Sequence, residues 1–384
     1  MRIAISTARQ AHYKLPANAF ARRGHEVTIY SSTPTHRFRG FDPSLGHRFV
    51  PAPVTLINAL TRIAFPVWLN ELDSAAYDQM AAMRLAECDL FLGAATSSLS
   101  TGKAAQRRGG TFVLDRACPD IRYQQTMLAE EAKKAGGVFR RNTQWFVERQ
   151  VEEYEQADLL LMPSNYSRNS YPEHIRSKTI LAPLCGRTRI QPRVGKPAGS
   201  PFVVGVVGGD PLRKGYLYLL QAWKELALPN AQLQIRSGEV YRRYATLARL
   251  VDEQPSVRMV PYVPDISQFY AQCDAFILSS VDDGFGMALF EAMANGVPSI
   301  ATHTTGASEL LVDGRDALLI DAWSVDAIKE SLGRLYESAE LRDELGRNGQ
   351  AAVSSLMEGE TARLYEEGIG RLLERVKERA SAAD

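Results

Sequence analysis

Short apolar segments that fit buried strands recur along the whole chain, and most of them are followed by a helical pattern. In the first half they lie at residues 2–6, 26–30, 89–95, 111–115, 158–164 and 178–184. In the second half they lie at residues 201–208, 231–237, 257–263, 274–280, 297–302 and 317–320. Apolar strands that alternate with helices are typical of parallel sheets covered on both faces. The pattern therefore predicts an α/β protein with two doubly wound, Rossmann-like sheets.

The chain has 384 residues, more than a single hydrophobic core usually organises, so we expect two domains. Residues 187–201, RTRIQPRVGKPAGSP, have the composition of an interdomain linker. We predict an N-terminal domain at 1–190, a linker at 191–200, a C-terminal domain at 201–360 and a terminal helix at 361–384. The terminal helix either crosses back onto the first domain or lies at the surface or in a dimer. Ligands are expected in the cleft, at the carboxyl ends of the strands.

Helical patterns follow several strands, and their positions are 15–23, 98–108, a long pair within 121–156, 341–356 and 361–380. Residues 34–70 are rich in Pro, Arg and aromatic side chains and follow neither the helical nor the strand period. The sequence leaves the structure of that segment open.

Composition narrows the class of protein. Hydrophobic residues make up 45% and charged residues 23% of the chain, as in globular proteins. No apolar run reaches about 18 residues and no long apolar stretch precedes the first strand, so we expect a cytoplasmic protein without a membrane span or secretory signal. The cysteines are far apart, so we expect free thiols and no zinc site. The histidines show no H-E-x-x-H spacing, so we expect no catalytic metal and no cofactor.

Charge is distributed unevenly. Residues 1–195 carry 26 Lys and Arg against 17 Asp and Glu, whereas the remainder carries 19 against 27. Much of the positive charge lies between Lys103 and Arg149, where Arg140 and Arg141 alternate with apolar and aromatic residues. Such a segment suits peripheral contact with an anionic membrane surface or a lipid-linked acceptor. A solvated helix face is the alternative interpretation. No nucleic-acid partner is expected.

Residues 282–302, DDGFGMALFEAMANGVPSIAT, hold the densest group of candidate functional residues. Glu291 lies eight positions after Asp283, about two turns into a predicted helix, so one ligand can contact both carboxylates. The turn between them contains Gly284, Phe285 and Gly286. The helix begins with the N–H groups of Met287, Ala288 and Leu289. Such N–H groups attract anions, so a phosphorylated sugar fits this segment.

A second segment follows the strand at 201–208. It begins with Gly208 and Gly209, and Arg213 and Lys214 then precede a helix. Two cations at the carboxyl end of a strand suit a diphosphate whose negative charge grows as it leaves. The alternative, an exposed basic cap at a helix start, opposes the helix dipole.

These two segments resemble the retaining glycosyltransferases of family 4, also called group 1, whose GT-B fold has two Rossmann-like domains facing across a cleft. The family usually has EGFG, an aliphatic pair, LEAMA, a Gly and P-V-I-A, and here Asp283 replaces the first Glu. Many members have an Arg at the position of Gly209, so Arg213 is expected to take its role. Glu309, in a Gly-x-x-Glu continuation, either contacts the donor or only stabilises a helix start. The resemblance covers most of residues 201–325.

The resemblance implies a mechanism. Arg213, Lys214 and the helix start hold the diphosphate, Glu291 binds the ribose and Asp283 binds the sugar, so the predicted catalytic residues are Asp283, Arg213 and Lys214. Further donor-binding positions implied by the family are Gly208, Gly209, Ser237, Gly238, Glu239, Val260, Tyr262 and Val263. In this family the donor's own phosphate is thought to accept the acceptor's proton. We therefore expect a retaining, metal-independent transfer of a hexose-type residue from a nucleotide diphosphate sugar.

The resemblance is thinner in the first half. A strand ending in Asp-Arg, then small residues and a His, is found in a subset of the family, and here Asp120 stands at the His position after Arg116. Asp120 either contacts a sugar hydroxyl or caps the following helix. The loop after the first strand places Arg9 and His12 near the cleft, where they contact the acceptor or are simply exposed.

Polysaccharide or glycolipid assembly, with a saccharide or lipid-linked acceptor, is the pathway that the family implies. Two other classes remain open: a GT-B nucleotide-sugar epimerase, which needs no acceptor, and a nucleotide-sugar binding module inactivated by the departures at Gly209, Asp120 and Asp283. A Rossmann oxidoreductase is disfavoured because no G-x-G-x-x-G follows the first strand.

Overall fold

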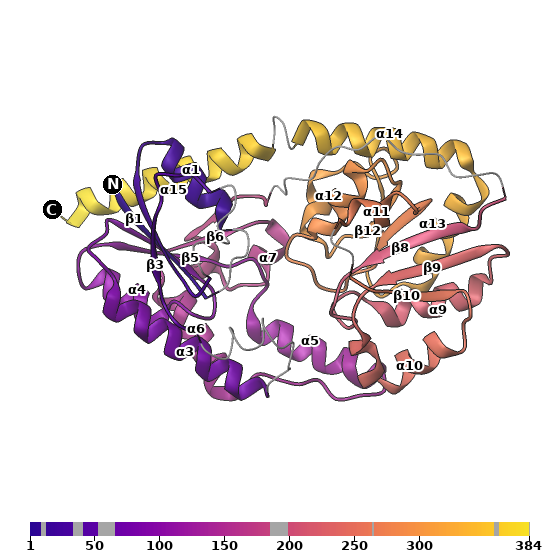
Figure 1. Ribbon diagram of the computed structural model, residues 1–384, viewed down its shortest axis with the longest axis horizontal. Helices are drawn as coiled ribbons and strands as arrows, with labels where there is room; N and C mark the ends of the chain where they lie inside the picture. Colours follow the sequence, from indigo (N-terminus) through magenta and orange to yellow (C-terminus); the bar gives the residue numbers. More distant parts are fainter. Residues whose placement is uncertain are drawn as a thin grey trace.

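The computed structural model describes residues 1–8, 13–33, 41–52, 66–184, 199–262, 265–356 and 361–383. They form two lobes side by side along the long axis of the molecule, each built around a parallel β-sheet with helices on both faces (Figure 1). The architecture is the GT-B fold that the sequence predicts.

The N-terminal sheet has seven strands in the order β3-β2-β1-β4-β5-β6-β7. They are β1 (Arg2–Thr7), β2 (Glu26–Ser31), β3 (Gly46–Phe49), β4 (Leu90–Ala94), β5 (Thr111–Asp115), β6 (Leu159–Met162) and β7 (Thr179–Leu181). The helices are α1 (Lys14–Arg22), α3 (Val67–Arg84), α4 (Leu99–Gln106), α5 (Ile121–Lys134), α6 (Gln144–Gln156), α7 (Asn165–Asn169) and α8 (Glu173–Arg176). Every residue of β4, β5 and β6 is buried, which explains their unbroken apolar sequences.

The C-terminal sheet has six strands in the order β10-β9-β8-β11-β12-β13. They are β8 (Phe202–Val207), β9 (Ala231–Arg236), β10 (Val257–Val260), β11 (Ala275–Leu278), β12 (Ser299–Thr302) and β13 (Leu318–Ile320). The helices are α9 (Tyr216–Leu226), α10 (Ala245–Asp252), α11 (Ser267–Tyr270), α12 (Met287–Ala294), α13 (Val325–Glu337), α14 (Ala339–Ser355) and α15 (Thr361–Ala383), with 3-10 helices η2 (Glu239–Arg243) and η3 (Gly306–Leu310). In both sheets the strand order reverses beside the first strand, so the two switch points lie between β1 and β4 and between β8 and β11.

All twelve apolar segments of the sequence are strands. The elements that the sequence left open include β3 and most of α3, both within or next to residues 34–70, and also α10 and α13. The strand β3 lies at the sheet edge with mostly exposed side chains, and α3 buries the acids Glu71, Asp73 and Asp78 beside Tyr77 and Ala81. The edge strand therefore has no hydrophobic period, and buried acids interrupt the period of α3.

The terminal helix α15 crosses back and lies along the N-terminal lobe, at the top of Figure 1. Glu366 forms an ion pair with Arg22 at 2.6 Å and another with Arg23. Gly368 packs so closely on β7 that an added Cβ would lie 2.6 Å from the carbonyl oxygen of Leu181. Of the predicted alternatives, the crossing helix is the one observed.

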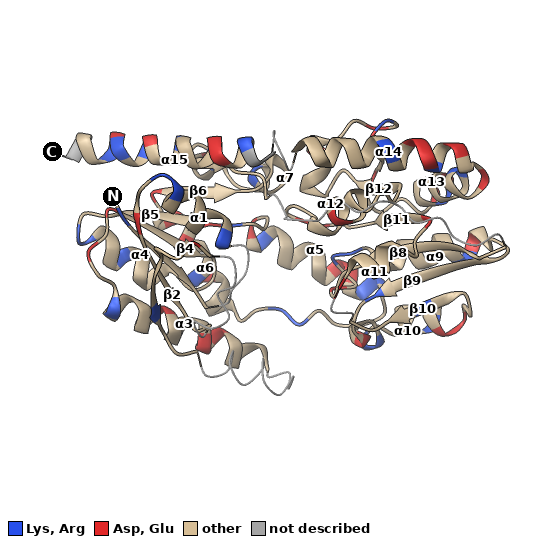
Figure 2. Ribbon diagram, turned by 45° about the horizontal axis from the view of Figure 1, so that its top comes forward, with Lys and Arg blue, Asp and Glu red and all other residues tan. Residues whose placement is uncertain are grey.

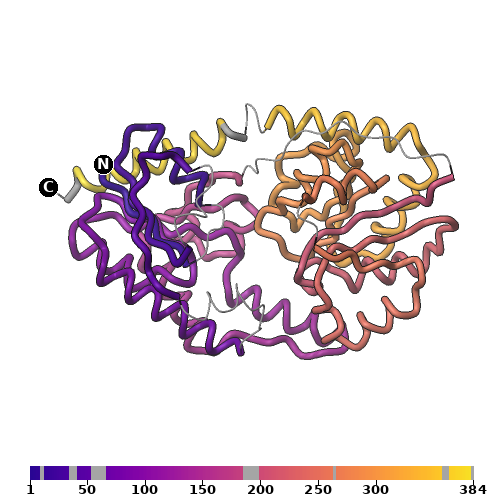
Figure 3. Tube along the Cα trace, viewed as in Figure 1, coloured from indigo at the N-terminus to yellow at the C-terminus, as the bar shows by residue number. Residues whose placement is uncertain are grey.

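The helix α5 also joins the two lobes, on the side opposite α15 (Figure 3). Its first residue, Ile121, packs in a core cluster of the N-terminal lobe, whereas Met127, Leu128 and Ala132, with Ala135 just after the helix, belong to the C-terminal core. The carbonyls that follow it cap α10, accepting from the amides of Thr246 at 3.0 Å and Ala245 at 3.1 Å. A boundary at residue 190 therefore separates the two sheets, whereas part of the C-terminal core comes from residues before it.

Candidate active site

The loops after β8 and β11 meet at the C-terminal switch point and pair through their backbones. The carbonyl of Arg213 accepts from the amides of Val281 at 2.9 Å and Asp282 at 3.3 Å. Gly215 has a left-handed backbone with φ 63°, and an added Cβ would clash with the carbonyl of Ser279. Two consecutive cations on one loop are thereby aligned with two consecutive acids on the other.

Two ion pairs follow from this alignment. The Nε of Arg213 lies 3.0 Å from Oδ2 of Asp282, and the Nζ of Lys214 pairs with Oδ2 of Asp283. Burial alone would raise the pKa of Asp283, but the charges of Lys214 and Arg213 outweigh burial and hold that pKa below its usual range. Asp283 is therefore ionised at neutral pH.

Glycines give this site its close packing. The side chain of Lys214 passes over Gly208, where an added Cβ would lie 2.6 Å from its Cε. Gly286, at φ 87°, turns the chain into α12, and a Cβ there would clash with Thr305. The amide of Leu289 donates to the carbonyl of Gly286 at 2.9 Å. Of the three N–H groups predicted to bind an anion at the helix start, that of Leu289 is therefore already hydrogen-bonded within the helix. The candidate anion site is left with the N–H groups of Met287 and Ala288.

Glu291 lies further along α12 and is half-buried. It accepts a hydrogen bond from the hydroxyl of Tyr270 at 3.0 Å. Burial raises its pKa, an effect that Tyr270 and nearby Arg236 partly oppose. The Arg236 guanidinium lies 4.6 Å from the ring centre of Tyr262, which is 79% exposed. These residues form one group at the carboxyl ends of β9 and β10, next to α12.

The remaining predicted donor-binding positions lie in the same region. Ser237, Gly238 and Glu239 follow β9, and Val260 ends β10. Gly209 has open space where a side chain would stand. Val263 lies outside the described residues.

The loop that carries the acidic residues also contacts the other lobe. The hydroxyl of Ser164 donates to the carbonyl of Gly284 at 2.7 Å, and a Cβ at Gly284 would clash with the carbonyl of Ala117. Glu309 accepts from the amides of Asn165, at 2.9 Å, and Tyr166, so it caps α7 of the N-terminal lobe. Glu309, in the first turn of η3, thus also links the two lobes.

Sequence reasoning missed Asp282. Its carboxylate is fully buried and has three partners, two of which come from the N-terminal lobe. One feature of the sequence could have revealed it. Two consecutive cations, Arg213 and Lys214, follow one strand, and two consecutive acids, Asp282 and Asp283, follow the strand that pairs with it.

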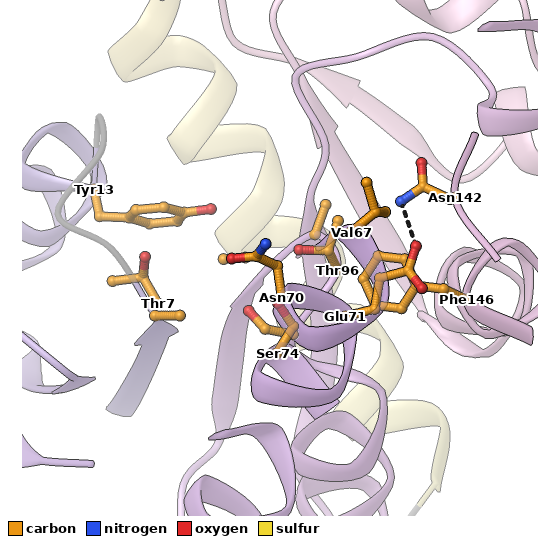
Figure 4. A pocket seen from close by; sticks show the side chains of 13 residues that line it. Thr7, Tyr13, Val67, Asn70, Glu71, Ser74, Thr96, Asn142 and Phe146 are labelled. Carbon is orange, nitrogen blue, oxygen red and sulfur yellow. Dashed lines mark hydrogen bonds between the residues drawn. The ribbon is translucent and has the colours of Figure 1, made fainter. Parts of the chain in front are cut away.

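The N-terminal switch point has a cavity of about 460 Å³ at the carboxyl ends of β1 and β4. Figure 4 shows Thr7 and Tyr13 on one side and Asn70 and Ser74 of α3 facing them. The lining is mostly uncharged: Thr7, Ala8, Tyr13, Val67, Asn70, Ser74, Ala94, Ala95, Thr96, Ser97, Asn142 and Phe146. Its one described charged member, Glu71, accepts from Asn142 at 2.9 Å and from Thr143.

A buried acid supports the loop that lines this cavity. Glu153 of α6 accepts from the amides of Thr96 at 2.6 Å and Ser98 at 2.7 Å. Burial raises the pKa of Glu153 to about 7, although these hydrogen bonds oppose the shift. Thr96 itself has φ 81°, a conformation that non-glycine residues rarely adopt.

The predicted acceptor residues have different placements. Arg9 and His12 lie outside the described residues, directly after the cavity-lining Ala8. Asp120 caps α5, accepting from the amide of Arg122 at 2.7 Å and the hydroxyl of Tyr154 at 2.8 Å. Arg116 is buried against Tyr171, Gln150 and the carbonyl of Pro119. Neither Asp120 nor Arg116 lines the cavity.

Comparison with known proteins agrees with this geometry. Residues 187–352 match the model of the family described as glycosyl transferases group 1. This part of the chain is a group 1 glycosyl transferase domain. A capsular polysaccharide biosynthesis glycosyltransferase, CapM of Staphylococcus aureus, is 28% identical over 44% of this chain and 45% of its own length. A lipopolysaccharide core biosynthesis glycosyltransferase, LpsE of Rhizobium meliloti, is 26% identical over 42% of this chain and 47% of its own. The chain thus spans about half the length of these relatives.

Solved structures resemble both lobes together. Sucrose-phosphate synthase from Thermosynechococcus elongatus superposes with a TM-score of 0.70 over 100% of both chains at 18% identity. HepE of Anabaena, solved with UDP and glucose, superposes with a TM-score of 0.66 over 98% of this chain and 100% of its own at 15% identity. At such identities the likeness establishes the fold of the whole chain, in which the group 1 domain forms the C-terminal lobe.

The described residues offer neither a membrane-spanning helix nor a metal-binding cluster. No helix among them is long and apolar enough to cross a bilayer. No three His, Cys, Asp or Glu side chains among them gather in a way that would hold a metal ion.

Proposed function

We propose that this protein is a retaining glycosyltransferase that moves a hexose-type residue from a nucleotide diphosphate sugar to a hydroxyl acceptor in polysaccharide or glycolipid assembly. One observation carries the proposal: two cations and two acids meet at the switch point of a group 1 glycosyl transferase domain. Ligands of doubly wound sheets bind at such a point.

The chemistry divides among these residues. Arg213 and Lys214 bind the diphosphate and stabilise the negative charge that grows on it as the glycosidic bond breaks. Lys214 exchanges Asp283 for the phosphate, and the ionised Asp283 then accepts hydrogen bonds from sugar hydroxyls. Glu291 binds the ribose, and Tyr262 offers an exposed aromatic face to the base. The leaving phosphate takes the acceptor's proton, so no other base is required.

The acceptor binds in the cavity at the N-terminal switch point, across the cleft from the donor. Uncharged hydroxyl and amide side chains with Tyr13 and Phe146 suit a saccharide, because sugars bind through hydrogen bonds and apolar ring faces. The relatives named for capsular polysaccharide and lipopolysaccharide biosynthesis support a saccharide acceptor.

A membrane surface is the proposed setting of the reaction. Two exposed side chains of α3, Trp68 at 53% and Leu72 at 50%, flank Glu71 on the cavity wall. Glu71 binds the α5–α6 connection, in which Val138 is 86% exposed and Arg140 and Arg141 are also exposed, and Trp145 at the start of α6 is 48% exposed. Figure 2 shows the connection, with a stretch of Lys and Arg in blue, running between the two lobes. Aromatic residues among cations suit an anionic lipid surface.

The membrane setting is tested with vesicles. Sedimentation with phosphatidylglycerol vesicles should be lost in Arg140→Glu/Arg141→Glu and absent with phosphatidylcholine alone. Equal binding of the variant and the wild type would refute a role for this surface.

Donor use is tested with a panel of UDP-, GDP-, ADP- and TDP-sugars, measuring released nucleotide diphosphate and thermal shift in the wild type, Asp283→Ala and Glu291→Ala. Donor-specific release that both variants lose would establish a transferase and name its donor. Stabilisation without release, even with saccharide acceptors added, would favour a binding module. Conversion of the donor sugar without an acceptor would favour an epimerase.

A further inference from the structure

Asp282 lies between the two lobes, and its carboxylate contacts residues of both. Its Oδ2 accepts from the Nε of Arg213 at 3.0 Å and from the Nε2 of Gln124 at 2.6 Å, and its Oδ1 accepts from the hydroxyl of Tyr166 at 3.2 Å. Arg213 belongs to the C-terminal lobe, whereas Gln124 of α5 and Tyr166 of α7 come from the N-terminal half of the chain. The contact therefore ties a predicted catalytic cation to the other lobe.

The geometry of Arg213 suits a guanidinium held for a ligand. Its hydrogen bond to Asp282 uses Nε, and within the described part of the chain the two Nη nitrogens have no hydrogen-bond partner. The guanidinium is planar, so a fixed Nε and a fixed backbone limit its orientation. The Arg213 side chain stays 28% exposed, so the Nη groups remain available to two phosphate oxygens.

The burial of Asp282 makes this orientation depend on the contact between the lobes. A fully buried carboxylate is stable only when its oxygens are paired and hydrogen-bonded. If the lobes separate, Asp282 loses Gln124 and Tyr166, and water reaches the Arg213 pair. The pair then weakens, because a hydrated ion pair contributes little.

We infer that Asp282 is a positioning residue, which orients Arg213 for the diphosphate only while the two lobes are in contact. The nature of the ligand rests on the proposed function, whereas the orientation and the contact between lobes do not. Asp282 touches no substrate in this account and acts through Arg213.

A double-mutant cycle tests whether Asp282 acts through Arg213. For the donor that the wild type uses, Asp282→Ala should lower kcat/KM about tenfold and Arg213→Ala about 100-fold. The double variant should match Arg213→Ala within about twofold, since nothing remains for Asp282 to orient. Losses that multiply to about 1,000-fold, or an unaffected Asp282→Ala, would overturn the inference.

The matched control is Glu131→Gln. Like Asp282, Glu131 is a buried acid that links the two halves of the chain. It lies on α5 and accepts hydrogen bonds from Tyr218 and Trp323 of the C-terminal lobe, but it does not contact Arg213. Its variant should show kcat/KM within about twofold of the wild type. An equal loss in Glu131→Gln and Asp282→Ala would mean that any loosening of the lobes lowers activity, which would refute the positioning role.

Two measurements on the ligand-free protein separate this inference from the proposed function. The NMR signal of the Arg213 Nε–H, assigned by its loss in Arg213→Ala, should exchange slowly with water in the wild type and at least tenfold faster in Asp282→Ala. Amide hydrogens of residues 165–169 should also exchange faster in Asp282→Ala. If no donor binds, the proposed function fails while these signals still decide the inference. Unchanged exchange at both places would refute it even in an active transferase.

Discussion

The two switch points have the same topology and opposite chemistry. Between β8 and β11, two cations face two acids, and the pKa of Asp283 is held low by its neighbours. Between β1 and β4, the cavity is lined mainly by uncharged polar groups, and the acid behind it, Glu153, has a pKa raised to about 7. Strand order places a site at each switch point, and the residues of the adjoining loops decide whether that site suits an anion or a neutral ligand.

The largest expected effect comes from removing the cations of the C-terminal switch point. Arg213→Ala or Lys214→Ala should each lower kcat by about 100-fold or more, because the leaving diphosphate loses a stabilising charge. Nucleotide release from the donor measures this loss. The control is Lys329→Ala, whose side chain pairs with Glu225 and Asp326 at the surface. Wild-type turnover in the Arg213→Ala/Lys214→Ala variant would mean that the charges of the C-terminal switch point do not serve the reaction.

The next effect concerns the close contact between the lobes. Gly284→Ala places a methyl group against the carbonyl of Ala117, so it should lower the free energy of unfolding by about 1–3 kcal/mol and weaken the contact between lobes. Gly238→Ala is the control, because no atom lies within 4 Å of its added Cβ. Thermal unfolding of the two variants measures the difference. Equal midpoints would mean that the acidic loop is less tightly packed than its neighbours indicate.

A smaller effect tests whether the N-terminal switch point serves the acceptor while the C-terminal switch point serves the donor. Ser74→Trp fills the cavity, so it should lower transfer to a saccharide acceptor about tenfold while donor binding stays unchanged. Gln79→Trp adds the same side chain to an exposed position of α3 and serves as the control. Product formation and nucleotide affinity are the measurements. Loss of donor affinity in Ser74→Trp would contradict the proposal that donor and acceptor bind at different switch points.

The smallest effect is a pH dependence of stability, which should have opposite directions at Glu153 and Asp283. Because the pKa of Glu153 is raised from the ordinary value of 4.5 to about 7, the folded state binds more protons between these values. Its contribution to stability is therefore present below about pH 4.5 and is lost as the pH rises to about 7. The amide of Glu153→Gln cannot accept from both Thr96 and Ser98, so this variant should melt lower at pH 5.

The gap in melting temperature between wild type and Glu153→Gln should narrow from pH 5 to pH 8. Asp283→Asn should behave in the opposite way as the pH falls, since the pKa of Asp283 is lowered and its stabilisation is lost on protonation. Melting curves from pH 5 to pH 8 measure the effect at Glu153, and melting curves below pH 3.8, the ordinary pKa of an Asp, measure it at Asp283. A gap at Glu153 that stays constant would mean that its carboxyl does not titrate there.

Much of the fold was predictable from local patterns. Every apolar segment became a strand because a strand buried on both faces needs apolar side chains throughout. The segments that failed, β3 and α3, are exposed at an edge or bury acids whose partners lie elsewhere, such as Asp78 with Arg149 and Thr101. A buried acid leaves no hydrophobic period in the sequence.

The residues that gather at the candidate donor site could be read from the sequence, whereas most of their contacts could not. Asp283, Arg213 and Lys214 were found from motif spacing, and they meet. Asp282 was not found, because a carboxylate next to a motif has no signal of its own until Gln124 and Tyr166 approach it.

The sequence by itself determined the two doubly wound sheets and the residues that meet after β8 and β11, because local apolar runs and turns specify parallel strands and place their carboxyl ends on one side of the sheet. The tertiary structure alone decided the contacts between lobes. Residues such as Glu309 and Asn165, or Glu131 and Trp323, lie more than 100 positions apart, and their partners are chosen only when both lobes pack. Long-range polar pairing depends on geometry that no local pattern encodes, and on this geometry Arg213, Asp282 and the N-terminal lobe become one site.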